Sequence, residues 1–470
     1  MGDEIGLALE HDLLLRVIQQ NKDRDPKLFE HIENTLMDFE DTRQPKKYES
    51  FLSRQTAQLR TAFYIDSERR VRGHMQTPSD EKAIILPSGQ KLTYSYARSA
   101  TCAFLEEKIA TNYCTQTDEL CDGILFSSGT AAINALLHLM VYNFSQIHQR
   151  SPAVAIVGDY FETLMIGELL SNYQAKVSHY SSITDIPNSP IDILLIEPIH
   201  YNWGLEGTDY SALLSFWREV GAPSYVIVDS TLTPESWGKY KILKKAREYG
   251  VGILCDVRSG LKQDQFGLEL ANVGIVEVYQ LHDKGDFSGD LRKVRAIYGT
   301  ALSPFECVIL DNSFFLNREW LNTHVALVAK NNSLFAEALA PLCGKGIFRS
   351  IAHPALLKSA SINHAPFSVL KLQNDGYEDY MFLLGVLYYE AHQRNIEFTF
   401  GGSFGFRGHR YDAVIPFKRD LRCIMKIAIG SRAGVFLREI INLIQEISSF
   451  ESMQGLRENY RMVKPVELEL

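Results

Sequence analysis

The chain has 470 residues, of which 46% are hydrophobic and 22% are charged, and its formal net charge is −9. This length exceeds what one ordinary hydrophobic core requires, so we expect two globular domains and an additional segment. No apolar run is long enough for a membrane span, so we expect a soluble protein without a membrane partner. The acidic balance excludes a general affinity for nucleic acids.

The seven cysteines are scattered, and none of them forms a C-x-x-C pair. This spacing favours neither a disulfide framework nor a zinc site, and we expect no bound metal. The N-terminal stretch MGDEIGLALE carries acids and lacks the basic segment of a secretory signal. These features predict a cytoplasmic protein.

The first part of the chain, residues 1–93, is predicted to be helical. Its apolar residues recur at helical spacing in HDLLLRVIQQ, KLFEHIENTLMDF and SFLSRQTAQL. We assign no chemistry to this region.

Residues 94–310 are predicted to form an α/β domain. Short apolar runs alternate with helical stretches there: GILFSSG, AVAIVGD, IDILLIEP, SYVIVDS, GILCDV and VGIVEVY. Runs without polar alternation are typical of parallel strands that helices cover on both faces. Residues 311–470 then combine the helical stretches ALVAKNNSLFAEALAPL and VFLREIINLIQEISSF with the strands FTFGG and MKIAIG. They predict a smaller α+β domain.

The residues that follow these runs carry the chemistry, because ligands of open parallel sheets bind beyond the carboxyl ends of the strands. After the first run, Ser128, Gly129 and Thr130 form a small-residue turn that leads into a helix. Backbone N–H groups at such a helix start favour a phosphate group. An ordinary serine cap is the alternative for this turn.

Two further strand ends carry an acidic and a basic residue. Asp229 directly follows SYVIV, and Lys262 lies just beyond GILCDV. An isolated strand-end aspartate often only caps the next segment, and most loop lysines are solvated. Pyridoxal 5′-phosphate (PLP), however, requires a phosphate site, an acid beside its ring nitrogen and a lysine at its aldehyde. All three are present in this order, so we expect PLP as the cofactor.

Five short motifs resemble those of the cystathionine γ-synthase and methionine γ-lyase family, whose members are fold type I PLP enzymes. In chain order they are Tyr96-Ala97-Arg98, SSGTAA from Ser127, Tyr160-Phe161-Glu162-Thr163, Asp229-Ser230-Thr231 and Ser259-Gly260-Leu261-Lys262. Later stretches such as ALSPFECVIL and GGSFG extend the resemblance over about residues 94–450. It implies an aspartate-aminotransferase-like α/β fold with a mostly parallel sheet.

The resemblance also implies roles for individual residues. Lys262 would form a Schiff base with PLP, Asp229 would pair with the ring nitrogen, and Tyr160 would stack on the ring. A core tyrosine is the alternative for Tyr160. The phosphate would be bound by Ser128, Gly129, Thr130, Thr231 and Ser259, with Tyr96 and Arg98 from a neighbouring subunit. Shared sites of this kind imply a homo-oligomer, either a dimer or a tetramer.

The chain departs from the family in the substrate pocket. Two family glycines are replaced by Phe161 and Glu162, and the family's asparagine near the cofactor is either Asn202 or is replaced by Tyr201. The arginine that would bind the substrate carboxylate falls on Lys426, which lacks a bidentate fork.

A nearby arginine is expected to replace that fork. We expect Arg407 or Arg410 to supply it, with Lys426 secondary and Ser403 in the same pocket. The alternative is that both arginines are surface residues.

The predicted function is PLP-dependent elimination or replacement at the β- or γ-carbon of an amino-acid substrate. Lys262 would serve as Schiff base and general base. Within the same fold, transamination is the alternative. Outside catalysis, the alternative is a degenerate homologue that acts as a binding module, which the altered pocket motifs favour and the retained Lys262 and Asp229 oppose.

Overall fold

The computed structural model describes residues 2–39, 44–72, 83–92, 102–113, 120–172, 175–282, 285–357, 362–415 and 423–467. The N-terminal region contains three helices: α1 (Gly2–Asn21), α2 (Pro26–Met37) and α3 (Pro45–Val71). Asp25 begins α2 by accepting a hydrogen bond from the Leu28 N–H, which satisfies a donor that the helix itself leaves free. The prediction of a helical N-terminal region is confirmed. The hairpin of β1 (Ile84–Ile85) and β2 (Lys91–Leu92) and helix α4 (Ala103–Tyr113) follow.

The central sheet has the strand order β3-β9-β8-β7-β6-β4-β5. Its strands are β3 (Leu120–Phe126), β4 (Ala153–Val157), β5 (Lys176–Tyr180), β6 (Ile193–Ile196), β7 (Tyr225–Asp229), β8 (Ile253–Ser259) and β9 (Gly274–Gln280). Pairing is parallel from β8 to β5, whereas β9 is antiparallel to both β3 and β8. Since β3 therefore runs in the direction of β8, the carboxyl ends of β3, β4, β6, β7 and β8 meet at one edge.

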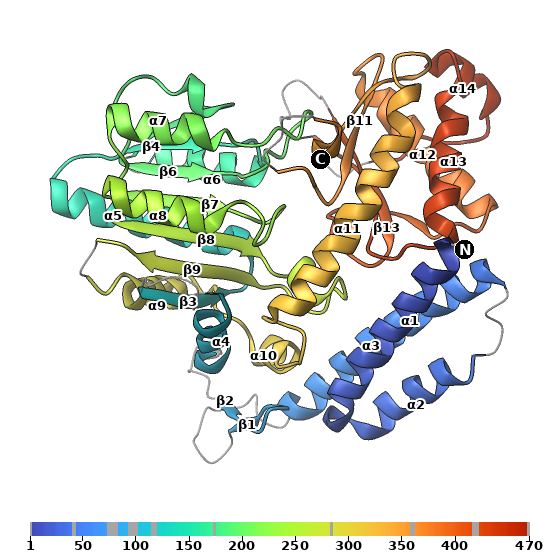
Figure 1. Cartoon of the computed structure of the whole chain (residues 1–470), viewed down its shortest axis with the longest axis horizontal. Helices are drawn as coiled ribbons and strands as arrows, with labels where there is room; N and C mark the ends of the chain where they lie inside the picture. The colour runs from blue at the N-terminus through green and yellow to red at the C-terminus, as the bar shows by residue number, and fades with distance from the viewer. Residues whose placement is uncertain are drawn as a thin grey trace.

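Helices cover both faces of this sheet (Figure 1). On one face, α5 (Gly129–His148), α6 (Phe161–Ser171) and α9 (Phe287–Ile297) bury apolar side chains. On the other face, α7 (Tyr210–Val220) and α8 (Lys239–Tyr249) do the same. Strands β4, β6 and β7 between these layers lack polar alternation, and all four residues of β6 are buried.

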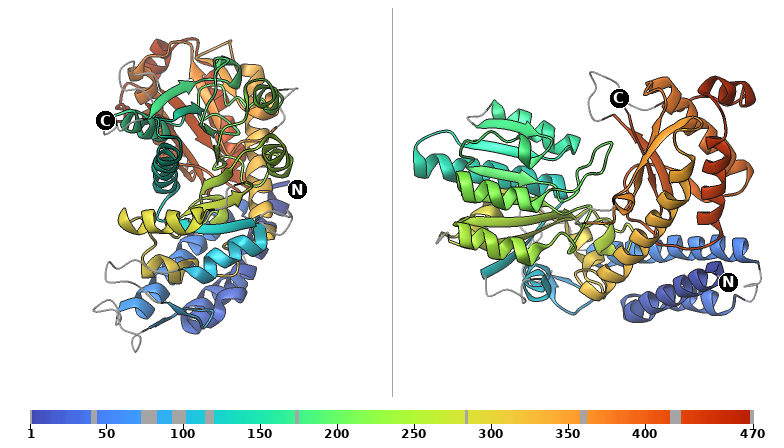
Figure 2. Two further views of the ribbon diagram at one scale, coloured as in Figure 1. Left: turned by 90° about the vertical axis from the view of Figure 1, so that its left-hand side faces the viewer. Right: turned by 45° about the horizontal axis from the view of Figure 1, so that its top comes forward.

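A second, smaller sheet lies beside the first. Its strand order is β10-β11-β14-β13-β12, and only β12 and β13 pair in parallel. Its strands are β10 (Phe348–Ala352), β11 (Ser368–Leu372), β12 (Phe398–Phe400), β13 (His409–Val414) and β14 (Ile424–Ala428). The helices of this part are α11 (Arg318–Leu339), α12 (Tyr377–Gln393), α13 (Val435–Ser448) and α14 (Met453–Asn459), whereas α10 (Pro304–Leu310) shares a hydrophobic core with β3 and β9 of the large sheet. The long α11 runs from the large sheet to the small one (Figures 1 and 2).

The N-terminal helices pack against both sheet-containing parts. Helix α3 contacts α10 on one side and α13 on the other, and Figures 1 and 2 show α1 and α3 running along the underside of the C-terminal part. Phe29 and Phe63 from the N-terminal helices share one hydrophobic core with Val308 of α10 and Trp320 of α11. This region is therefore part of the folded body.

The mostly parallel central sheet, the smaller α+β part and the helical N-terminal region confirm the predicted fold class. The domain boundaries after residues 93 and 310 stay a prediction. Within the described ranges, none of the helices combines the length and apolar character that crossing a membrane requires.

The cysteines do not all have the same state. Cys102, Cys255, Cys307, Cys343 and Cys423 are free thiols, whereas Cys121 is disulfide-bonded. The scattered spacing of the cysteines in the sequence did not indicate this bond.

Candidate active site

A cavity of about 310 Å³ lies at the carboxyl edge of the central sheet, and its volume falls within the ~300–1,000 Å³ range of small-molecule sites. Its walls come from the segments that follow five strands of this sheet and from residues of the C-terminal part. The predicted residues that line it are Ser128, Gly129, Thr130, Tyr160, Asp229, Thr231, Ser259, Lys262, Ser403 and Lys426. Tyr96 and Arg98 lie outside the described residues.

The start of α5 forms the first wall. The Ser128 hydroxyl caps the helix by accepting the Ala131 N–H at 3.0 Å, as the alternative reading of this turn expected. Among the described residues, the N–H groups of Gly129 and Thr130 find no acceptor, because the first N–H groups of a helix have no partner within it. They remain available to an anion.

The ends of β7 and β8 are held together beside this helix start. The Ser259 N–H donates to the Thr231 hydroxyl at 3.0 Å, and the Thr231 N–H donates to the Asp229 carboxylate at 3.1 Å. Burial raises the pKa of Asp229, and the hydrogen bonds from Thr231 and the charge of Lys262 offset only part of this effect. The carboxyl group therefore lacks a full counter-charge among the described residues.

Lys262 lies in the turn after β8, and its side-chain amine has no hydrogen bond or ion pair with a described residue. Its Nζ is 4.9 Å from the centre of the Phe404 ring. Burial, together with the charge of Lys426, lowers the pKa of Lys262 to about 8 although the charge of Asp229 opposes the shift. A larger fraction of this amine than of an exposed lysine is therefore neutral near neutral pH and available as a nucleophile.

Glu197, which follows β6, organises two aromatic side chains of the cavity. Its carboxyl group accepts the N–H groups of Tyr160 and Tyr201, both at 2.9 Å. The two rings meet edge to face with centroids 5.4 Å apart. Burial, together with the charge of Asp229, raises the pKa of Glu197 to about 8, and burial also raises the pKa of Tyr160.

Tyr201, not Asn202, lines the cavity. The Asn202 amide instead donates to Asp159 at 2.8 Å. Of the two readings left open by the sequence, the tyrosine therefore holds the position beside the site.

Lys426 supplies a positive charge on the side of the C-terminal part. Its Nζ donates to the Tyr201 hydroxyl at 3.0 Å and lies 3.3 Å from the Asp412 carboxylate. Burial alone would lower the pKa of Lys426, but Tyr201 and Asp412 raise it. Sequence reasoning missed Asp412, which faces Lys426 across the β13–β14 pair, because such a contact requires knowledge of strand register.

Arg407 and Arg410 are not placed as the sequence analysis expected. Neither lines the cavity. Arg407 is 1% exposed and makes a bidentate ion pair with Glu10, and Arg410 pairs with Glu269. In this structure neither arginine is placed to supply the carboxylate fork, because both guanidinium groups are paired elsewhere, and the expected role of either arginine stays a prediction.

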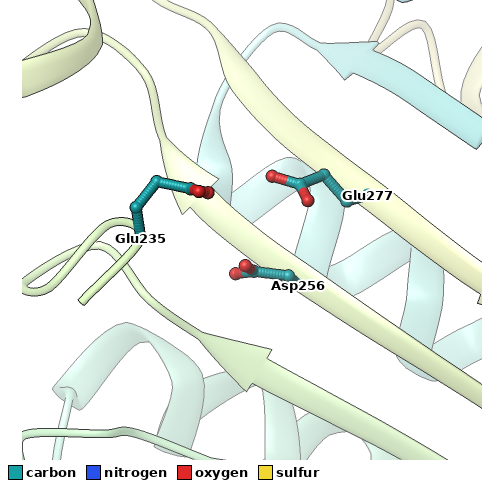
Figure 3. A group of neighbouring side chains, drawn as sticks. All are labelled: Glu235, Asp256 and Glu277. Atoms are coloured by element: carbon teal, nitrogen blue, oxygen red, sulfur yellow. The ribbon is translucent and has the colours of Figure 1, made fainter. Parts of the chain in front are cut away.

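Three acidic side chains from the loop after β7 and from strands β8 and β9 converge on one another (Figure 3). Glu235, Asp256 and Glu277 present ligand atoms within 4.8 Å of one another. The Lys239 Nζ, however, lies 2.6 to 2.8 Å from all three carboxylates. Its ammonium group holds the position that a cation would take, so we assign no metal to this cluster.

The residues present fit PLP. The donors at the α5 start suit its phosphate, the under-compensated carboxyl group of Asp229 suits a protonated ring nitrogen, and Lys262 provides an amine with a lowered pKa.

The chain has the fold of fold type I PLP enzymes, which confirms the fold predicted by the resemblance. The structure is similar to cystathionine γ-synthase from Xanthomonas oryzae pv. oryzae in complex with cystathionine, with 17% sequence identity, a TM-score of 0.54, and coverage of 76% of this chain and 88% of that chain. It is also similar to cystathionine γ-lyase from yeast, with 18% identity, a TM-score of 0.53 and the same coverage of 76% and 88%. No family model and no curated protein matches the sequence.

Proposed function

We propose that this chain is a PLP-dependent enzyme that catalyses elimination or replacement at the β- or γ-carbon of an amino-acid substrate. The observation that carries the proposal is the juxtaposition, in one cavity, of Lys262 with a lowered pKa, the strand-end Asp229 and the free donors of the α5 start. The likeness to cystathionine γ-synthase and γ-lyase supports this class of reaction.

Each wall of the cavity has a role in this proposal. Gly129, Thr130 and the hydroxyl groups of Thr231 and Ser259 bind the phosphate, and Asp229 holds the proton of the ring nitrogen. The bound cofactor supplies an electron sink for charge that develops at the substrate Cα. Tyr160 packs against the cofactor ring.

The substrate side of the proposal rests on Lys426 and Lys262. Lys426 binds the substrate carboxylate as a point charge, and its contacts with Tyr201 and Asp412 fix where that charge lies. The Lys262 amine takes up the Cα proton as general base, and for γ-chemistry it transfers a proton at Cβ as well. A cytoplasmic location and a homo-oligomer belong to the same proposal.

The test begins with PLP fixed to the protein by borohydride. We expect a yellow protein whose fixed cofactor is recovered on the peptide that contains Lys262 and is lost in Lys262→Ala. Recovery on another lysine would refute the site.

The reaction class is then decided with amino acids that carry β- or γ-leaving groups. Release of the leaving group together with ammonia and a keto acid supports the proposal. Conversion of the cofactor to its amine form identifies a transaminase, and protein that binds PLP but converts no amino acid indicates a binding module.

A further inference from the structure

Helix α1 contributes a buried carboxylate to the C-terminal part. Glu10 is 3% exposed, and its two oxygens accept from the Nε and an Nη of Arg407, the first at 3.0 Å. Arg432 lies 3.5 Å from the same carboxylate. Burial alone would raise the pKa of Glu10, but the two guanidinium groups lower it below its usual value, so the pair stays charged.

Arg407 connects this carboxylate to the turn that carries Lys262. Its guanidinium donates to the Phe266 carbonyl at 3.2 Å and lies over the Phe266 ring at 4.5 Å. Its backbone N–H donates to the Gly267 carbonyl, and the Gly267 N–H donates to the Lys262 carbonyl at 3.1 Å. Two hydrogen bonds therefore separate Arg407 from the backbone of Lys262.

Arg407 also ends the loop 402–407, which lines the cavity through Gly402, Ser403 and Phe404. Ser403 has a φ of 73°, a left-handed conformation that is unfavourable for a non-glycine residue and persists only where the surroundings hold it. A Cβ on Gly405 would lie 2.9 Å from the Gln263 side chain, so the loop packs directly on the Lys262 turn. His324 holds the same loop through the Gly405 carbonyl at 2.9 Å.

We propose that Glu10 is a positioning residue, which acts through Arg407 to hold loop 402–407 against the Lys262 turn. The N-terminal helices would then complete the substrate side of the cavity. The role of this loop in substrate binding rests on the proposed function. The part of the proposal in which Glu10 and Arg407 hold the loop in place does not.

The decisive comparison is between Glu10→Gln and Glu49→Gln. Glu49 of α3 is fully buried and also links the N-terminal region to the C-terminal part, but it does so by accepting the Phe436 N–H at the start of α13. Both variants are expected to lose stability. Only Glu10→Gln removes a charge that faces Arg407, so only this variant should loosen loop 402–407.

The first measurement is hydrogen–deuterium exchange of the cofactor-free protein. We expect Glu10→Gln to speed exchange about tenfold in residues 402–408 and 263–267, because a buried charge-assisted hydrogen bond is lost. Glu49→Gln should speed exchange only at the start of α13. Equal responses at the loop in both variants, or no response in either, would overturn the proposal. Glu10→Asp keeps the charge and should restore part of the protection.

The second measurement uses PLP-loaded protein and two probes that react with the cofactor's aldehyde. Aminooxyacetate carries a carboxylate, and methoxyamine does not. We expect Glu10→Gln to raise the aminooxyacetate concentration that gives the half-maximal rate about tenfold. The rate of the reaction with methoxyamine should be unchanged. Equal changes with both probes contradict a role in shaping the substrate side. Protein that does not bind PLP refutes the proposed function, and the exchange measurement still decides the positioning.

Discussion

At the scale of single residues, the chemistry of the cavity depends on how burial and neighbouring charges set the protonation state of Lys262. Burial favours the neutral amine, Lys426 adds to this effect, and Asp229 favours the ammonium form. Reaction with an aldehyde requires the neutral amine, so the balance of these contributions decides whether the lysine reacts near neutral pH.

The pH dependence of Lys262 reactivity follows from this balance. Reductive methylation of Lys262 in the cofactor-free protein should rise with a midpoint near pH 8 instead of the usual 10.5. Lys426→Met should move the midpoint up, because a cation that disfavours the ammonium form is removed. Asp229→Asn should move it down. Mass spectrometry of the Lys262 peptide across pH measures this, and a midpoint near 10 in the wild type would contradict the burial of the amine.

Recognition of the substrate carboxylate is expected to depend on Lys426. Lys426→Met should slow the reaction of PLP-loaded protein with aminooxyacetate about tenfold or more, without slowing the reaction with methoxyamine. Arg410→Met is the matched control, because Arg410 pairs with Glu269 outside the cavity lining. If Arg410→Met reduces the preference for the carboxylate probe and Lys426→Met does not, the assignment is reversed.

The partners of Arg407 and Lys426 could not be predicted from the sequence. The strand-end residues Asp229 and Lys262 were predicted because each lies directly beyond an apolar run. The pairing of Arg407 with Glu10 joins residues that are 397 positions apart, and no local pattern indicates it. The same holds for Asp412, which meets Lys426 only through strand register.

At the scale of elements, the apolar runs located six of the seven strands of the central sheet. Strand β5 (KVSHY) escaped because it lies at the edge of the sheet and contains no fully buried residue. The direction of β9 was also not predictable, because VGIVEVY is as apolar as a parallel strand yet pairs antiparallel on both sides. Strand direction depends on how the connecting segments return to the sheet.

The contact between β9 and the α5 turn yields a prediction at this scale. A Cβ on Gly274 would lie 2.2 Å from the Ser128 carbonyl oxygen. Gly274→Ala should therefore displace the phosphate turn, lower the free energy of unfolding by about 1–3 kcal/mol and weaken PLP binding. Gly408→Ala is the control, since a Cβ there meets no atom within 4 Å. Urea unfolding and absorbance titration with PLP measure both effects, and equal behaviour of the two variants would show that the turn tolerates the methyl group.

At the scale of the whole molecule, the N-terminal helices are not an appendage. Their apolar side chains share a core with α10 and α11, and their acids Glu10 and Glu49 are buried against the C-terminal part. The sequence predicted the helices from their periodicity but assigned them no role, because the role arises from contacts with segments several hundred residues away.

A subunit arrangement with shared sites predicts complementation between two inactive variants. The family resemblance assigns Arg98 to the phosphate of a neighbouring subunit. Lys262→Ala should leave no cofactor fixed by borohydride, and Arg98→Ala should retain little, because the phosphate loses a guanidinium group. In a mixed dimer, the subunit with intact Lys262 has a neighbour with intact Arg98, so one of its two sites is complete.

Co-refolding of equal amounts of the two variants should therefore restore about a quarter of the wild-type level of fixed cofactor, since half of the randomly formed dimers are mixed and each has one complete site. If Arg98 acts on the site of its own chain, neither site of a mixed dimer is complete and mixing restores nothing. Refolding each variant alone is the control, and sedimentation confirms that dimers form. A protein that is monomeric and still holds PLP tightly would contradict the shared site, because the unpaired charge of the phosphate would then have to be met within one chain.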